Sequence, residues 1–345
     1  MLHYQCKTPG LWHKENAIPC QDSFAVSDGN PKCIIAAVAD GLGSERKSDI
    51  GSDIAVQTTV KYCAEHFDEN MSVQNIKDMM QEAFHAALNA VWNEAAFAEK
   101  DEDKDPNEYD TTLCLAIYNG ERLFYGQAGD SGMIAIFEDG KYDRITTQQR
   151  NEEGQVFPLC AGPEKWEFGV INLPVSGVLL MTDGVFDLIC PKNLRDTDQE
   201  IYIPLAQMLL DWFDCTEEDM SEIETSVQKY IENKLVLEAK DDTTVVALIN
   251  EKRPPKKLDN SYYAKPDLAA RQAEIEHKFT ELQAGVNKKY ENIIYGEKKN
   301  SEKQLLKDEK ATDETGISEK EDKMKKQVMN VPNSIELLKK NGTIL

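Results

Sequence analysis

The sequence predicts an α+β domain in which antiparallel β-hairpins pack against long helices. Three observations lead to this fold class: several short apolar runs of strand length, two glycine turns that join neighbouring runs, and one long stretch with helical periodicity. Because the turns connect consecutive strands directly, we expect a layered antiparallel arrangement and not alternating βαβ units.

Five apolar runs predict buried strands, at residues 34–39, 113–118, 123–127, 133–137 and 178–181. The run TTVVALIN, which ends at Asn250, is also strand-like. The pairs Asn119-Gly120 and Asp139-Gly140 lie between such runs and are typical of tight hairpin turns. We therefore expect hairpins over residues 113–127 and from residue 133 onward.

Two long helices are predicted before residue 100. In one, which starts near Ser72, apolar residues recur at helical spacing at Ile76, Met79, Ala83, Phe84, Ala87, Ala90 and Val91. Serine is a good helix N-cap, so Ser72 is the expected start. The other helix follows the DGLGS turn, with Ile54, Val56, Val60, Tyr62 and Cys63 available for its inner face. Further helices are expected between residues 203 and 237.

The composition changes near Pro254-Pro255, after which charged residues dominate. We predict one domain over residues 1–252 and a charged helical or flexible C-terminal extension over 253–345. Within the extension, residues 262–295 have a helical apolar period, which suits either packing on the domain or association with a partner or a second copy. Residues 297–330 are expected to be a flexible linker, and VPNSIELLKKNGTIL a short terminal helix.

The formal net charge of -23 argues against nucleic acid or an anionic membrane as partner, because those surfaces need clustered Lys and Arg. The eight cysteines form no C-x-x-C pair, which favours reduced thiols in a cytoplasmic protein. No signal peptide or membrane span is expected, since no stretch reaches roughly 18 apolar residues.

Three aspartates come directly after buried strands, each in a glycine-containing turn: Asp40 in VADGLG, Asp130 in AGDSG and Asp183 in MTDGVFD. A single Asp-Gly turn is ordinary. Three such turns at strand ends can converge, and a carboxylate cluster without His or Cys suits Mg²⁺ or Mn²⁺. The five histidines lack zinc-hydrolase spacing, so zinc chemistry is disfavoured.

Five segments in order, CQDSF, VADGLGS, DTTLCLAIYNGERLFYGQAGDSG, LLMTDGVFDLI and KDDTTVVAL, resemble the PPM family of protein phosphatases, the PP2C type, especially its bacterial members. The resemblance covers roughly residues 1–250. It implies an antiparallel β-sandwich flanked by helix pairs, with the metal site at one end. It also implies hydrolysis of phosphoserine and phosphothreonine on proteins, with two or three Mn²⁺ or Mg²⁺ ions per chain.

The resemblance implies that Asp40 bridges two metals, that the Gly41 carbonyl joins one of them, and that Asp183 and Asp241 ligate the other. The neighbouring Asp242 is an alternative to Asp241 that the sequence leaves open. In such a site a bridging hydroxide attacks phosphorus in line, so no covalent phosphoenzyme is needed. No cysteine has an Arg six positions later, which excludes a Cys-based phosphatase loop.

The remaining assignments are Asp22, which acts in this family through a metal-bound water, and Asp130 with Asp183 and Asp187 at a third-metal position. Gln21 stands where an acidic residue is common. The resemblance thus assigns catalysis to Asp22, Asp40, Asp183 and Asp241.

Many family members grip the substrate phosphate with an Arg shortly before the acidic pair, yet the first Arg here is Arg46. His13 and Lys14 lie in that region and are the predicted phosphate donors. The missing Arg and Gln21 motivate an alternative, a pseudophosphatase or phosphoprotein-binding scaffold with little turnover. The expected partners are a bacterial Ser/Thr kinase or its phosphorylated substrates.

Overall fold

The computed structural model describes residues 1–27, 33–97, 105–195 and 197–313. Within them the chain forms two five-stranded antiparallel sheets. In the first sheet the strand order is β1 (Leu2–Thr8), β10 (Thr243–Ile249), β9 (Val175–Met181), β6 (Gly132–Phe137) and β7 (Tyr142–Arg144). In the second it is β2 (Asp22–Ser27), β3 (Ile34–Asp40), β4 (Leu113–Tyr118), β5 (Leu123–Ala128) and β8 (Glu167–Ile171).

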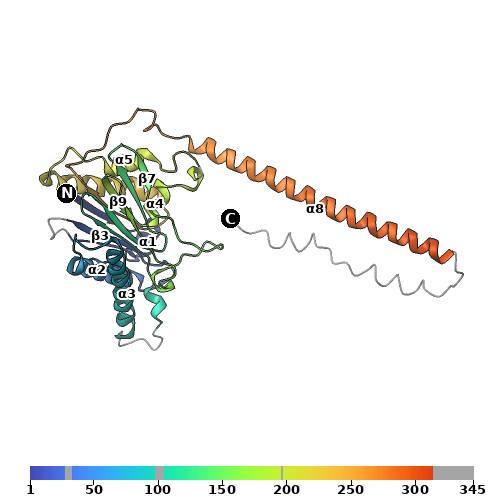
Figure 1. The fold of residues 1–345 in the computed structure, drawn as a ribbon, viewed down its shortest axis with the longest axis horizontal. Helices are drawn as coiled ribbons and strands as arrows, with labels where there is room; N and C mark the ends of the chain where they lie inside the picture. The colour runs from blue at the N-terminus through green and yellow to red at the C-terminus, as the bar shows by residue number, and fades with distance from the viewer. Residues whose placement is uncertain (28–32, 98–104, 196, 314–345) are drawn as a thin grey trace. The chain divides into compact units, whose positions relative to one another are not determined.

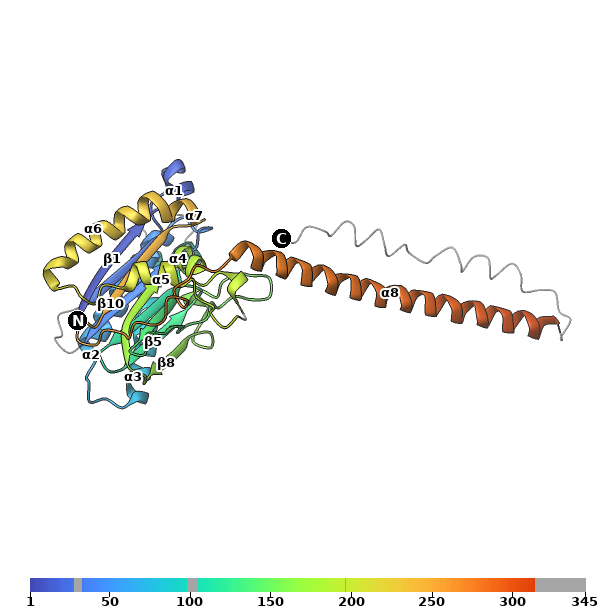
Figure 2. The same ribbon diagram turned by 90° about the horizontal axis from the view of Figure 1, so that it is seen from above.

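Three apolar layers hold the sheets and helices together. Alternate strand residues such as Val38, Leu180 and Val246 fill the space between the sheets. Helices α2 (Ser48–His66) and α3 (Val73–Phe97) cover the outer face of the second sheet (Figure 1). Helices α4 (Asp183–Ile189), α5 (Ile203–Leu210) and α6 (Met220–Tyr230) cover the first sheet, as Figure 2 shows for α6 beside β1. The predicted fold class, a helix-flanked antiparallel β-sandwich, is confirmed.

The remaining elements are short. They are α1 (Leu11–Asn16), α7 (Val236–Glu238), a π-helical turn (Ile231–Leu235) that continues α6, and 3-10 turns at Pro106–Tyr109, Leu159–Ala161, Lys192–Leu194 and Glu217–Asp219.

Local sequence signals account for several boundaries. The Ser72 hydroxyl accepts a hydrogen bond from the Asn75 amide at 3.1 Å, which caps the start of α3 as predicted. Gly120 and Gly140, which end the two predicted hairpin turns, have φ of 82° and 92°. A side chain is strained at such angles, so glycine is needed there. Strands β1, β2, β7 and β8 were not predicted, because their apolar residues alternate with polar ones over short lengths.

The chain divides into two compact units, Met1–Gln272 and Ala273–Leu345. Helix α8 runs from Leu268 to Asp313, so the expectation of a flexible linker is wrong for residues 297–313. Lys, Glu, Gln and Leu dominate this stretch and are good helix formers, which extends the helix despite its high charge. The predicted terminal helix of residues 331–345 lies outside the described residues. Within the described part of the chain, no helix has both the length and the apolar character of a membrane span.

Candidate metal centre

Asp22 and Asp40 face each other at one end of the second sheet. Asp22 starts β2, Asp40 ends β3, and the antiparallel register pairs the two directly. Asp22 is 1% exposed and Asp40 is partly exposed. Gly41 follows without a side chain, because a Cβ there would lie 2.5 Å from the Ser48 carbonyl oxygen. The strand ends therefore hold two carboxylates in place, and the backbone at Gly41 lies close to that of Ser48.

Asp130 and Asp183 reach the same end of the sandwich from other elements. Asp130 lies in the turn between β5 and β6 and is 1% exposed. Asp183 is the first residue of α4, directly after β9. Asp40, Asp130 and Asp183 each offer a carboxylate oxygen within 4.8 Å of the others. The three acidic turns of the sequence thus converge in space, and we call these residues, with Asp22, the carboxylate cluster.

The neighbouring aspartates Asp241 and Asp242 have different surroundings. Asp242 is 2% exposed, and its two oxygens accept hydrogen bonds from the Gly10 and Gln21 amides, each at 2.6 Å. One of these oxygens also lies 2.7 Å from Nδ1 of His13. Asp241 is exposed, and its charge helps to raise the pKa of Asp40 and of Asp183. Asp242 is thus held by donors from distant segments, whereas Asp241 is exposed, and both lie with His13 in a second group whose potential ligand atoms are within 4.8 Å of one another.

Several carboxylate oxygens of the cluster have no hydrogen-bond donor. Asp22 Oδ1, Asp183 Oδ1 and both oxygens of Asp130 are buried without a hydrogen-bond partner among the described residues. Burial, and then the charge of Asp130, raises the pKa of Asp183 to about 7. Burial is also the largest cause of the raised pKa of Asp22, of Asp40 and of Asp130. Buried carboxylates of like charge with free oxygens fit a divalent cation, which prefers oxygen ligands.

Threonines beside the cluster orient its carboxylates. The Thr182 hydroxyl donates to Asp22 Oδ2 at 2.7 Å and accepts from the Thr244 amide at 3.1 Å. Thr112 accepts a hydrogen bond from the Asp40 amide at 2.9 Å, and its hydroxyl lies 2.8 Å from that of Ser131. Such outer contacts fix the direction of ligand oxygens. In the sequence, Thr112, Ser131 and Thr244 each lie within two residues of an aspartate, and Thr182 directly precedes Asp183.

Arg150, which the sequence did not predict as a site residue, contacts the carboxylate cluster. Its Nη2 lies 2.5 Å from Asp130 Oδ2 and 3.0 Å from Asp183 Oδ2. The nearby Asp187 is exposed and accepts a hydrogen bond from Gln148 Nε2 at 2.9 Å. No local pattern marks Arg150, which lies in the segment QQRNEEG far from every acidic turn.

The two predicted phosphate donors lie on α1. His13 is 5% exposed and its Nδ1 contacts Asp242, whereas Lys14 is exposed. His13 therefore supports the turn before β10, and its role toward phosphate stays a prediction, as does that of Lys14.

The family model described as Protein phosphatase 2C matches residues 10–232, a range that contains Asp22, Asp40, Asp130 and Asp183. The chain belongs to the protein phosphatase 2C family. It is thus a protein serine/threonine phosphatase by family, as the five motifs predicted. The comparison with curated proteins found no match.

Solved structures with the same fold include two variants of a bacterial serine phosphatase. One is 14% identical, covering 75% of this chain and 100% of that chain at a TM-score of 0.51. The other is 15% identical, covering 72% of this chain and 98% of that chain at a TM-score of 0.50. These two likenesses show that the phosphatase 2C sandwich is the fold of this chain.

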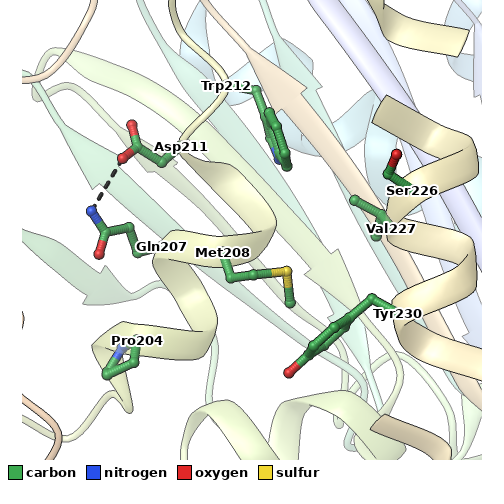
Figure 3. A pocket seen from close by; sticks show the side chains of 8 residues that line it. All are labelled: Pro204, Gln207, Met208, Asp211, Trp212, Ser226, Val227 and Tyr230. Atoms are coloured by element: carbon green, nitrogen blue, oxygen red, sulfur yellow. Dashed lines mark hydrogen bonds between the residues drawn. The ribbon is translucent and has the colours of Figure 1, made fainter. Parts of the chain in front are cut away.

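A separate pocket of about 370 Å³ lies between α5 and α6 (Figure 3). Trp212, Met208 and Tyr230 line the pocket. Two further lining residues are joined by a hydrogen bond, which Gln207 Nε2 donates to Asp211 Oδ2 at 3.1 Å. None of its lining residues belongs to the carboxylate cluster.

Proposed function

We propose that this chain hydrolyses phosphoserine and phosphothreonine on proteins, using two or three Mn²⁺ or Mg²⁺ ions held by the carboxylate cluster and Asp241. The observation that supports this is the set of buried carboxylate oxygens without donors at the convergence of three strand-end turns. Such a set is unfavourable by itself and becomes favourable around a cation. In the cell, the proposed substrates are proteins phosphorylated by a Ser/Thr kinase in bacterial signalling, or the kinase itself.

The proposed roles of the metal-binding residues follow from their positions. Asp40 pairs with Asp22 across the strands and offers an oxygen within 4.8 Å of one of Asp183, so it is the proposed bridging ligand, with the Gly41 carbonyl as a further proposed ligand. Asp183 and Asp241 are the proposed ligands on the other side. The bound cations supply an activated water as the nucleophile and neutralise negative charge on the phosphoryl group.

Two further residues have proposed roles near the cations. Asp22, whose carboxylate accepts a hydrogen bond from Thr182, is proposed to act through a metal-bound water. Asp187 with Asp130 is proposed for the third ion, and Gln148 fixes the direction of Asp187.

The test is hydrolysis of p-nitrophenyl phosphate and of a phosphothreonine peptide with Mn²⁺. We expect Asp40→Asn and Asp183→Asn to lower kcat by about a hundredfold or more, since each removes a proposed ligand of the cations that would stabilise the transition state. The control is Asp53→Asn, an exposed residue of α2, which should match wild type. Calorimetric titration with Mn²⁺ counts the ions. If wild type turns over no faster than Asp40→Asn, the chain is a pseudophosphatase or scaffold.

The C-terminal extension is proposed to associate with a second copy of the chain through α8. Five apolar side chains, Phe279, Leu282, Val286, Tyr290 and Ile293, are about half to two-thirds exposed and recur every three or four residues along one side of the helix. The helix carries nine basic and nine acidic residues. Two copies of α8 therefore have no net charge repulsion, unlike the acidic remainder of the chain.

Sedimentation velocity of the full chain tests this association. Val286→Glu should shift the protein toward the monomer, because it places a charge in the apolar stripe. Ala284→Glu adds the same charge on the opposite side of the helix, about 200° away, and should leave the distribution unchanged. A wild-type protein that is monomeric at all concentrations contradicts the proposal.

A further inference from the structure

Arg150 contacts the carboxylate cluster through a single nitrogen. Its Nη2 lies near both Asp130 and Asp183, at 2.5 and 3.0 Å, while its Nε is buried and has no hydrogen-bond partner in the described part of the chain. The Asp130 contact is an ion pair without good hydrogen-bond geometry, because both Asp130 oxygens lack a hydrogen-bond partner. A guanidinium presents five donors in a planar fork, so most of its bonding capacity is unused here.

The backbone next to Arg150 is fixed to the acidic turn that carries Asp130. The Gln149 amide donates to the Gly129 carbonyl at 3.0 Å, and the Gly129 amide donates to Gln149 Oε1 at 3.0 Å. The buried Gln127 amide group donates to the carbonyls of Gly129, Ser131 and Thr147 at 2.9–3.0 Å. The Arg150 backbone is therefore held beside the site, while its side chain is 30% exposed.

The carboxylates that Arg150 contacts are also candidate metal ligands. Asp130 and Asp183 belong, with Asp40, to the group whose oxygens lie within 4.8 Å of one another. Arg150 is thus the counter-ion of oxygens that a divalent cation would take, and the two cations compete for them. Once those oxygens hold a metal, the guanidinium loses both partners beside the place where a phosphoryl group must bind.

We propose that Arg150 is the phosphate-binding arginine of this phosphatase: it neutralises Asp130 and Asp183 before metal binds and then turns its guanidinium fork onto the substrate phosphate. The inference rests on the proposed function. Many family members bind the substrate phosphate with an arginine near the start of the domain, and this chain has no arginine before Arg46. Arg150 would take that role from another segment. The planar fork matches two phosphate oxygens, which a lysine cannot do.

Calorimetry on the full chain separates the two parts of the proposal. Mn²⁺ is titrated into the metal-free protein, and inorganic phosphate into the Mn²⁺-saturated protein. Arg150→Ala should bind Mn²⁺ about tenfold more tightly, because its competitor is gone, and phosphate about 10- to 100-fold more weakly, because a charged hydrogen bond is lost. Arg195→Ala, an exposed arginine, is the control and should bind both as wild type does.

Arg150→Lys distinguishes charge from geometry. It keeps the positive charge, so Mn²⁺ affinity should stay near that of wild type, whereas phosphate binding should stay weak. Unchanged or weaker Mn²⁺ binding by Arg150→Ala overturns the competition, and unchanged phosphate binding overturns the phosphate role. Neither titration depends on turnover, so a failure of the proposed activity in the hydrolysis assay is recognised separately.

Discussion

Asp242 and Asp130 are both almost fully buried at the same end of the sandwich, yet their surroundings are opposite. Asp242 accepts hydrogen bonds from two backbone amides and contacts His13, whereas the Asp130 carboxylate has no hydrogen-bond partner and only the Arg150 ion pair among the described contacts. A buried carboxylate supplied with donors ties three chain segments together. A buried carboxylate without donors can bind a cation, but its unpaired charge lowers the stability of the metal-free protein.

The largest expected effect on stability is at Asp242. Asp242→Ala leaves the Gly10 and Gln21 amides and His13 without their acceptor, so the free energy of unfolding should fall by about 3–5 kcal/mol. Urea denaturation followed by circular dichroism measures this. The matched comparison is Asp241→Ala, one residue away and exposed. If both variants unfold at the same urea concentration, the distinction between the two aspartates is wrong.

A smaller effect of opposite sign is expected at Asp130. Asp130→Asn removes a buried charge from a like-charged cluster, but it also removes the Arg150 ion pair. We expect the metal-free protein to become about 1 kcal/mol more stable. Burial raises the pKa of Asp130, so its ionised form is unfavourable in the folded state, and the substitution removes that cost. The same variant should lose the stabilisation that Mn²⁺ confers on wild type. Destabilisation of the metal-free variant would show that the ion pair outweighs the repulsion.

A separate prediction concerns the pH dependence of the metal-free protein. The pKa of Asp183 is raised to about 7 in the folded state, so the folded chain binds more protons than the unfolded chain between about pH 4 and 7. Stability should therefore fall as pH rises through this window. Thermal unfolding in EDTA at several pH values measures the slope, and Asp183→Asn should flatten it. A wild-type stability that rises between pH 5 and 7 contradicts the raised pKa.

Much of the fold was predictable because its signals are local. The apolar runs of β3, β4, β5, β6 and β9 and the period of α3 lie within short windows, and each appears where predicted. The unpredicted β1 and β8 are edge strands, whose short alternating patterns are weak before a partner strand is known. The extent of α8 was underestimated, because a charged stretch without a core has little to mark it as helix.

The sequence alone determined which aspartates follow buried strands in glycine turns, and this selected Asp40, Asp130 and Asp183 without any structure. Only the tertiary structure distinguished Asp241 from Asp242, because the donors that occupy Asp242 come from residues more than 220 positions away. The same holds for Arg150, which contacts Asp183 across 33 residues and follows Gln149, whose hydrogen bonds to Gly129 join it to the β5–β6 turn. The local sequence pattern shows where a strand ends, whereas the partners of a buried charge depend on which distant segments the fold brings together.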